Sequence, residues 1–327
     1  MIKACILLVV GMVLLIKGAD FFVDGASKIA KALKIPTLII GLTLVSLGTS
    51  LPELSVSLQA AFAGSSDLSI GNVVGSNLFN TFLILGVAAL FVPLAFDDAM
   101  RKYDVPIMVG IYLLLFLFSF VITPHKINLV ESLILVALLV TYIIHLIIRT
   151  KESNEEASND QEENETITKK DILKSIVFVV LGVTAIILGG NFVVNNAVYI
   201  AGKLGMSEAL IGLTIVAVGT SLPELVTSVV ASIKKENDIA LGNVIGSNIF
   251  NVLFIIGVSS TIKPLNISHA MGFGINKALF DLIILTVSGI LVLLIAKLSK
   301  NMKKWQGVIF FLLYVAYLIF IILRDMA

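Results

Sequence analysis

The sequence GTSLPEL occurs twice in this chain, at residues 48–54 and again, letter for letter, at residues 219–225. The two copies are 171 residues apart, and the same shift aligns GNVVGSNLFN at 71–80 with GNVIGSNIFN at 242–251. Over the 50 aligned positions that contain both motifs, 26 residues are identical, without a gap. Self-similarity of this extent at one fixed offset indicates an internal duplication.

The composition is that of a membrane protein. The chain has 327 residues, of which 58% are hydrophobic and only 14% charged, and its mean hydropathy is +1.04. Apolar runs long enough to span a bilayer recur throughout. Five lie in each half, at residues 4–30, 36–63, 68–93, 104–123, 127–149, 174–201, 207–233, 238–262, 275–298 and 305–323.

An odd number of spans in a repeated unit makes the second copy enter the membrane in the opposite direction. We therefore predict an all-α membrane protein with ten transmembrane helices, arranged as two inverted five-helix repeats over residues 1–149 and 171–327. The apolar run after Lys3 could also belong to a signal peptide, but no small-x-small cleavage site follows it.

Lysine and arginine are distributed unevenly between the predicted loops. With the N-terminus outside, 16 of them lie on the cytoplasmic side and 6 on the other. The positive-inside rule then predicts a multi-pass protein of the cell membrane with both termini extracellular. Residues 150–170, between the halves, are polar and acidic, so we expect a flexible cytoplasmic linker there.

Several function classes are disfavoured by composition. A formal net charge of +1 gives no basic field for nucleic acid. The single cysteine, Cys5, excludes an internal disulfide, and the three histidines have no metal-ligand spacing. No nucleophile with a nearby base is recognisable, so we expect neither an enzyme nor a bound cofactor.

Polar residues interrupt the apolar helix predicted at 36–63 and form a stripe on one helical face. An intramembrane stripe of this kind must face the protein interior or a water-filled path, because an ionised side chain in hydrocarbon is costly. The stripe consists of Ser46, Thr49, Ser50, Glu53 and Ser57, and its counterpart in the second half consists of Ala217, Thr220, Ser221, Glu224 and Ser228.

A proline lies inside each stripe. Pro52 and Pro223 remove the helical bond to the carbonyl four residues earlier, so we predict breaks in the second and seventh helices. Freed carbonyls at membrane depth are tolerated where they line a cavity or bind ions. Carboxylate, hydroxyl and carbonyl oxygens are the ligands of hard cations such as Ca²⁺. The alternative, buried glutamates that only hold helices together, fits poorly with two related glutamates, each beside a break.

The third and eighth predicted helices carry amides. Ser76 and Asn80 are four residues apart and share a face, as do Ser247 and Asn251. We predict that Asn80 and Asn251 are cation ligands. The glycines of these helices suit close packing, and the remaining asparagines suit the satisfaction of broken helix ends, namely Asn72, Asn77, Asn243 and Asn248.

GTSLPE twice, each followed by GNVxGSNxxN, resembles the paired alpha-repeats of the cation/calcium exchanger superfamily, and most of all prokaryotic sodium/calcium exchangers. The resemblance covers the whole chain. It implies a mid-membrane cluster of sites in which Glu53 and Glu224 bind Ca²⁺ and also serve as ligands of Na⁺. Asn80 and Asn251 would line the central site.

For the remaining positions, the resemblance implies ligands of two kinds. Hydroxyls for the flanking Na⁺ sites would come from Ser50, Ser221, Ser76 and Ser247, and backbone carbonyls from Thr49 and Thr220 and from near Ser46 and Ala217. It also implies that the first and sixth helices slide past the rest, and that the protein needs no partner beyond the transported ions and lipid. We expect it to function as a monomer.

One departure bears on ion coupling. Several members of the superfamily carry an aspartate where this chain has Asn80 or Asn251, so its central site holds two carboxylates rather than three. Two negative charges balance one Ca²⁺ and leave a net charge with about three Na⁺, which favours electrogenic exchange and argues against potassium dependence. Coupling to H⁺ is the alternative, because glutamates also take protons, and a cation channel is a remote one.

Overall fold

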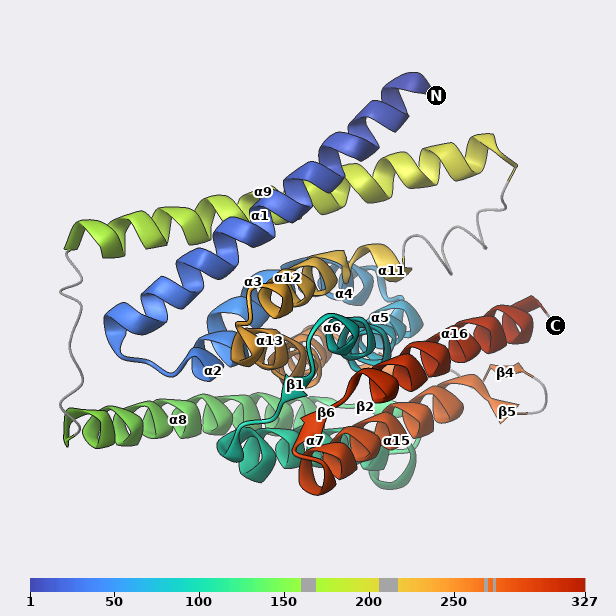
Figure 1. The fold of residues 1–327 in the computed structure, drawn as a ribbon. Helices are drawn as coiled ribbons and strands as arrows, with labels where there is room; N and C mark the ends of the chain where they lie inside the picture. The colour runs from blue at the N-terminus through green and yellow to red at the C-terminus, as the bar shows by residue number, and fades with distance from the viewer. Residues whose placement is uncertain (160–168, 206–216, 268–269, 273–274, 327) are drawn as a thin grey trace.

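The computed structural model describes residues 1–159, 169–205, 217–267, 270–272 and 275–326 (Figure 1). Among these residues, eight helices are long and apolar enough to cross a membrane, and a ninth span is counted if one bent helix pair is joined. The eight are Ile2–Leu33, Ser66–Phe91, Met100–Ile122, Leu129–Glu152, Asp171–Lys203, Asn237–Ile262, Lys277–Leu298 and Lys304–Arg324. The prediction of a polytopic helical membrane protein is therefore confirmed.

The bent pair is the helix that carries Glu53. Its first part runs from Thr37 to Thr49 through α2 (Thr37–Ile40), the π-helical segment η1 (Gly41–Val45) and α3 (Ser46–Thr49). Its second part, α4 (Leu51–Ala63), turns away by 50°. Ser50 lies between them with φ −83° and ψ 7°, and Pro52 follows in the first turn of α4, where its missing N–H is tolerated. The predicted break in this helix is confirmed.

The corresponding helix of the second half is described from Ala217 onward. A short helix, α11 (Ala217–Gly219), is followed by α12 (Leu222–Ile233), which again begins with a serine and has a proline in its first turn. The predicted seventh span, 207–233, lies partly outside the described residues.

Two helices form the interior of the bundle. One consists of α5 (Ser66–Leu78), the π-helical segment η2 (Phe79–Ile84) and α6 (Leu85–Phe91). The other consists of α13 (Asn237–Phe250), η6 (Asn251–Ile256) and α14 (Gly257–Ile262). In these helices 78% and 94% of the 18-residue apolar stretch is buried inside the protein, against at most 44% in the other six long helices. The GNVxGSN motifs thus lie in the middle of the protein.

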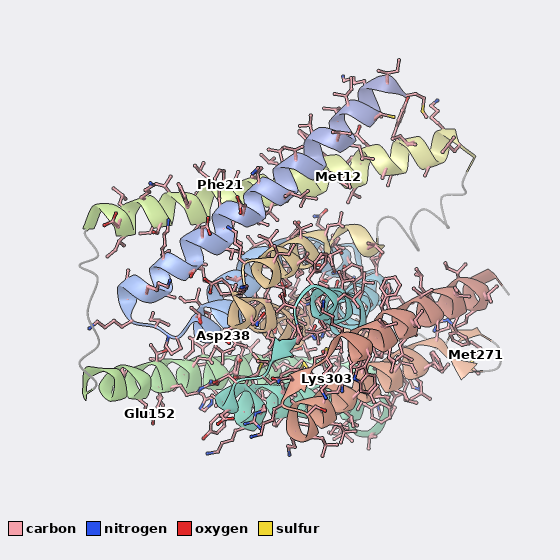
Figure 2. The ribbon with its side chains drawn as sticks, in the orientation of Figure 1. Met12, Phe21, Glu152, Asp238, Met271 and Lys303 are labelled. Carbon is pink, nitrogen blue, oxygen red and sulfur yellow. The ribbon has the colours of Figure 1, made fainter. Side chains whose placement is uncertain are left out.

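Helices α1 (Ile2–Leu33) and α9 (Lys169–Lys203) lie side by side along one edge of the molecule (Figure 1). Gly11, Gly18 and Gly25 recur every seven residues on α1, and a Cβ atom on any of them would come within 3 Å of the α9 backbone. The lack of a side chain therefore lets the two backbones approach closely. Apolar side chains such as Met12 and Phe21 cover the exposed part of α1 (Figure 2).

The remaining long helices complete the opposite side of the molecule. They are α7 (Val105–Leu117, between the π-helical segments η3, Met100–Asp104, and η4, Phe118–Ile122), α8 (Leu129–Asn159), α15 (Lys277–Leu298) and α16 (Lys304–Met326). Short antiparallel strand pairs link their connections: β1 (Leu94–Ala95) with β6 (Asn301–Met302), β2 (Lys126–Ile127) with β3 (Leu265–Asn266), and β4 (Met271–Gly272) with β5 (Ile275–Asn276). The first two pairs join one half of the chain to the other.

The segment between the halves differs from the expected flexible tether. Helix α8 continues to Asn159, ten residues past the end predicted at 149, so the first part of the 150–170 segment is helical. Its lysine, glutamate and alanine residues are good helix formers, which allows the helix to extend beyond its apolar part. Residues 160–168 lie outside the described part of the chain.

Candidate functional site

The two broken helices meet at their breaks through a pair of crossed hydrogen bonds. Ser50 Oγ donates to Glu224 Oε1 at 3.0 Å, and Ser221 Oγ donates to Glu53 Oε1 at 2.8 Å. All four side chains are at most 4% exposed. Each serine therefore holds the glutamate of the other half of the chain, and the two halves form a single site.

The positions of the two serines at the starts of their helices explain why each bonds to the glutamate of the other half. Ser50 and Ser221 are the N-cap residues of α4 and α12, and the glutamates stand three residues later, the spacing of a capping box. Neither serine side chain caps its own helix in the structure. The helix break turns each hydroxyl toward the opposite half, while the carboxylates remain in the first helical turn, where the helix dipole favours a negative charge.

The interior helices add further hydroxyls to this centre. Ser76 Oγ lies 3.0 Å from Ser221 Oγ and 3.5 Å from Glu53 Oε1. Ser247 Oγ lies 3.1 Å from Ser50 Oγ, and it also lies 3.4 Å from the backbone oxygen of Ser46. Four predicted serines and both glutamates thus form two hydrogen-bonded clusters, one around each glutamate.

An asparagine on each interior helix anchors the backbone beneath each glutamate. Asn72 Nδ2 donates to the backbone oxygen of Glu53 at 3.1 Å and to Ser57 Oγ at 2.9 Å. The same bonds recur in the second half, where Asn243 Nδ2 lies 3.3 Å from the backbone oxygen of Glu224 and 2.9 Å from Ser228 Oγ. These asparagines were expected at broken helix ends, and the structure places them against the helical turns that carry the carboxylates.

Asn80 and Asn251 lie at the start of the π-helical segments η2 and η6, and both are buried. Such π turns are common at functional sites, because the extra residue redirects the side chains around it. These π turns could not be predicted from the apolar pattern of the sequence. Four residues earlier, on the same helical faces, Ser76 contacts Ser221 and Ser247 contacts Ser50.

Each of the two glutamates and of the two asparagines Asn80 and Asn251 has a buried oxygen atom without a hydrogen-bond partner among the described residues. They are one carboxylate oxygen from each glutamate and one amide oxygen from each asparagine: Glu53 Oε2, Glu224 Oε2, Asn80 Oδ1 and Asn251 Oδ1. A buried acceptor without a donor is costly, and native proteins rarely leave one without a reason. A set of such oxygens, two of them on carboxylates, fits a cation that is bound there during function.

The chemistry of the donors favours a hard cation. In the described part of the chain, no group of three or more His, Cys, Asp or Glu side chains is placed to hold a metal ion. The oxygens here come instead from two carboxylates, hydroxyls and amides, which suit Na⁺ and Ca²⁺ rather than a transition metal.

The remaining predicted ligand positions are Thr49, Thr220 and Ala217. Thr49 Oγ1 donates within its own helix and lies 3.0 Å from Asn243 Oδ1, so its side chain braces the site from behind. Thr220 Oγ1 has no hydrogen-bond partner among the described atoms. Ala217 begins α11, next to residues that the structure does not describe.

Comparison with known proteins identifies the family of this chain. The family model described as sodium/calcium exchanger protein matches residues 3–148 and 174–323. The sodium/calcium exchanger MaX1 of Methanosarcina acetivorans is 34% identical over 96% of this chain and 97% of its own length. The inner membrane protein YrbG of Escherichia coli is 37% identical over 81% of each chain.

The fold itself matches a solved exchanger. The sodium-calcium exchanger NCX_Mj, soaked with 10 mM Na⁺ and no Ca²⁺, superposes with a TM-score of 0.82 at 30% identity, over 96% of this chain and 97% of that one. The family match covers most of both halves, and MaX1 is matched over nearly its whole length. The chain therefore belongs to the sodium/calcium exchanger protein family, within the cation/calcium exchanger superfamily.

Proposed function

We propose that this protein is a secondary active antiporter that exchanges Na⁺ for Ca²⁺ across the cell membrane by alternating access. The observation that carries the proposal is the convergence of Glu53 and Glu224, each held by a serine of the other half and each with one unpartnered oxygen. Relatives named as sodium/calcium exchangers supply the choice of ions. The family consists of transporters, which accords with the expectation that this chain is not an enzyme.

We assign the cation ligands to oxygens of the two clusters around the glutamates and of the two buried asparagines. Glu53, Glu224, Asn80 and Asn251 surround the Ca²⁺ position, and the hydroxyls of Ser50, Ser76, Ser221 and Ser247 serve flanking Na⁺ positions. The backbone carbonyls near Ser46, Thr49, Ala217 and Thr220 complete the set. Two carboxylates support electrogenic exchange of about three Na⁺ per Ca²⁺, because three Na⁺ exceed their charge by one and a single Ca²⁺ balances it.

The proposed topology has ten transmembrane helices in two inverted five-helix repeats, with both termini outside and the 150–170 linker in the cytoplasm. The 16-to-6 distribution of basic residues supports this orientation. Helices α1 and α9 form a separate pair on the edge of the bundle, so we infer that they move against the interior helices during alternation. Monomeric function is proposed, since the site is complete within one chain.

The test is calcium uptake into proteoliposomes under an imposed Na⁺ gradient or an imposed pH gradient. We expect uptake driven by Na⁺ and its loss in Glu53→Gln and in Glu224→Gln, whereas Glu152→Gln, at an exposed position on α8, should behave like the wild type. Uptake driven only by pH would assign the protein to H⁺/Ca²⁺ exchange. A calcium current without counter-transport would indicate a channel instead.

Electrogenicity is tested in the same vesicles by clamping the membrane potential with K⁺ and valinomycin. If about three Na⁺ exchange for one Ca²⁺, the rate should depend on the sign of the potential. A rate that ignores the potential would point to two Na⁺ per Ca²⁺ and overturn the charge argument.

A further inference from the structure

Two asparagines lie one helical turn before the proposed ligands Asn80 and Asn251. Asn77 is in α5 and Asn248 is in α13, and the two are equivalent under the 171-residue offset. Both are completely buried. Their side chains nevertheless bond to different groups, and this difference bears on the orientation of a ligand.

The orientation of Asn77 is determined by an unambiguous acceptor. Its Nδ2 donates to the backbone oxygen of Asn248 at 3.1 Å, and a carbonyl oxygen can only accept. The amide of Asn77 therefore cannot be turned over without losing this bond. Its Oδ1 must then face the other way, toward Asn251.

The same logic fixes Asn251. Asn251 Nδ2 donates to Asn77 Oδ1 at 2.9 Å, and that oxygen can only accept. The NH₂ group of Asn251 is thereby bonded to Asn77, and its Oδ1 is left buried without a hydrogen-bond partner among the described residues. Asn251 shares a helical face with Ser247, four residues earlier, which lies 3.1 Å from Ser50, so we place the free oxygen on the side of η6 that faces the glutamates.

The equivalent arrangement is missing in the other half. Asn248 Nδ2 donates to Thr81 Oγ1 at 3.0 Å and lies 3.6 Å from Met108 Sδ, rather than bonding to the backbone oxygen of Asn77. Thr81 is replaced by Val252 at the corresponding position, so this hydroxyl exists in one half only. Both amide atoms of Asn80 are unpartnered among the described residues.

We infer that Asn77 is a positioning residue for cation binding, which fixes the amide of Asn251 so that its oxygen, and not its NH₂ group, is presented to the ion. This inference rests on the proposed function. A turned amide would direct two N–H dipoles at a cation and weaken its binding. The two site asparagines are thus not equivalent: Asn251 is pre-oriented, and Asn80 orients when the ion binds.

The first test compares two equivalent variants in proteoliposomes. Asn77→Ala should raise the Ca²⁺ concentration for half-maximal Na⁺-driven uptake about tenfold, the effect of one hydrogen bond, and change the maximal rate less. Asn248→Ala removes an equally buried amide that holds no proposed ligand side chain, and it should shift half-saturation much less. Equal shifts in the two variants would overturn the inference.

A double-mutant cycle separates positioning from a general structural role. In an Asn251→Ala background, Asn77→Ala should cause no further shift in half-saturation, because the group that it orients is gone. The same shift in both backgrounds would mean that Asn77 acts through something other than Asn251. Wild-type protein that shows no gradient-driven uptake would refute the proposed function, whereas an active wild type with an unchanged Asn77→Ala would refute only this inference.

A second pair of variants, Asn77→Leu and Asn248→Leu, covers the case in which Asn77→Ala does not fold. Both keep the approximate volume of the side chain without adding a charge, but only Asn77→Leu removes the acceptor for Asn251. We expect Asn77→Leu to bind Ca²⁺ more weakly than Asn248→Leu, measured by the shift of the unfolding temperature with added Ca²⁺ in detergent. Equal weakening in the two would contradict the inference.

Discussion

Ser50 and Ser221 give the first prediction at the scale of single residues. Their hydroxyls bond to buried carboxylates, and hydrogen bonds to charged groups contribute about 1.5–3 kcal/mol. We expect Ser50→Ala and Ser221→Ala each to raise the Na⁺ concentration for half-maximal exchange about tenfold or more. Sodium titration of calcium uptake measures this.

Ser288 provides the matched control for these two variants. It is equally buried, but among the described residues its hydroxyl bonds only to the carbonyl of Leu285 in its own helix. Ser288→Ala should leave the Na⁺ dependence unchanged. If all three serine variants behaved alike, the crossed bonds would have no special part in ion binding.

The residues of the centre could largely be predicted from the sequence. Glu53 and Glu224 stand out because an intramembrane carboxylate beside a helix break needs a reason, and the duplication presents that reason twice. The crossing of Ser50 to Glu224 could not be predicted, since periodicity places side chains on a face but does not say which face of another helix they meet. The orientation of Asn251 depends on a backbone oxygen of Asn248, which no sequence pattern encodes.

At the scale of helices, the α1–α9 contact gives the second prediction. A Cβ on Gly18 would lie 2.9 Å from the backbone of Gly182 and of Ile186, so Gly18→Ala forces the helices apart. We expect it to destabilise the protein by about 1–3 kcal/mol, the usual effect of overpacking. Thermal unfolding in detergent measures the change.

Gly71 is the control for this substitution. It also lies inside a helix, α5, but a Cβ there would meet nothing within 4 Å. Gly71→Ala should therefore be neutral or stabilising, by up to about 1 kcal/mol from helix propensity. Equal destabilisation in both variants would show that the close approach of α1 and α9 is not what Gly18 provides.

A buried ion pair gives the third prediction. Arg149, near the polar end of α8, lies 2.9 and 3.0 Å from the two carboxylate oxygens of Asp104, at the end of η3. Tyr142 also donates to Asp104, at 3.2 Å. Asp104→Asn leaves the arginine charge without its partner, and we expect it to cost about 3–5 kcal/mol.

Removing the charge as well should reverse much of this loss. The double variant Asp104→Asn with Arg149→Met has no buried unpaired charge, and we expect it to unfold at a higher temperature than Asp104→Asn alone. A double variant less stable than the single one would show that Arg149 stabilises the protein by some other contact.

The existence of the helices was predicted more reliably than their local geometry and their ends. The apolar runs gave nearly all the spans, and Pro52 gave the position of the break. The π turns at Asn80 and Asn251 were missed, because one extra residue per turn leaves no trace in an almost wholly apolar segment. The extension of α8 was missed because its acidic residues were interpreted as solvated linker, although they are also good helix formers.

At the scale of the whole molecule, two ion pairs connect the outer helix α1 to the end of the broken helix α12. Lys234, just beyond the end of α12, lies 2.6 Å from Asp20 and 2.7 Å from Asp24 on α1. Burial lowers the pKa of Lys234, but hydrogen bonds to the two aspartates raise it, and the net direction is above 10.5. Its stabilising contribution is therefore present throughout the physiological range and is lost only as the pH rises through this raised pKa.

The fourth prediction uses this contact to test movement of α1. We propose Asp24→Cys with Lys234→Cys in a Cys5→Ser background, joined by a bifunctional thiol reagent with a cleavable spacer. Cross-linking should stop Na⁺-driven calcium uptake, and cleavage of the spacer should restore it, because α1 can no longer move against α12. Single-cysteine variants treated in the same way should stay active, and a cross-linked protein at full rate would refute the proposed motion.

The crossed bonds between Ser50 and Glu224, and between Ser221 and Glu53, also bear on how such a protein can evolve. After a duplication, each copy can normally accumulate substitutions independently. Here, a substitution at either serine removes a hydrogen bond to a glutamate in the other copy. Compensation for such a change has to arise 174 or 168 residues away. A substitution at one of these serines is therefore expected to be tolerated only together with a change in the other copy, and neither half alone carries the full set of proposed ligands.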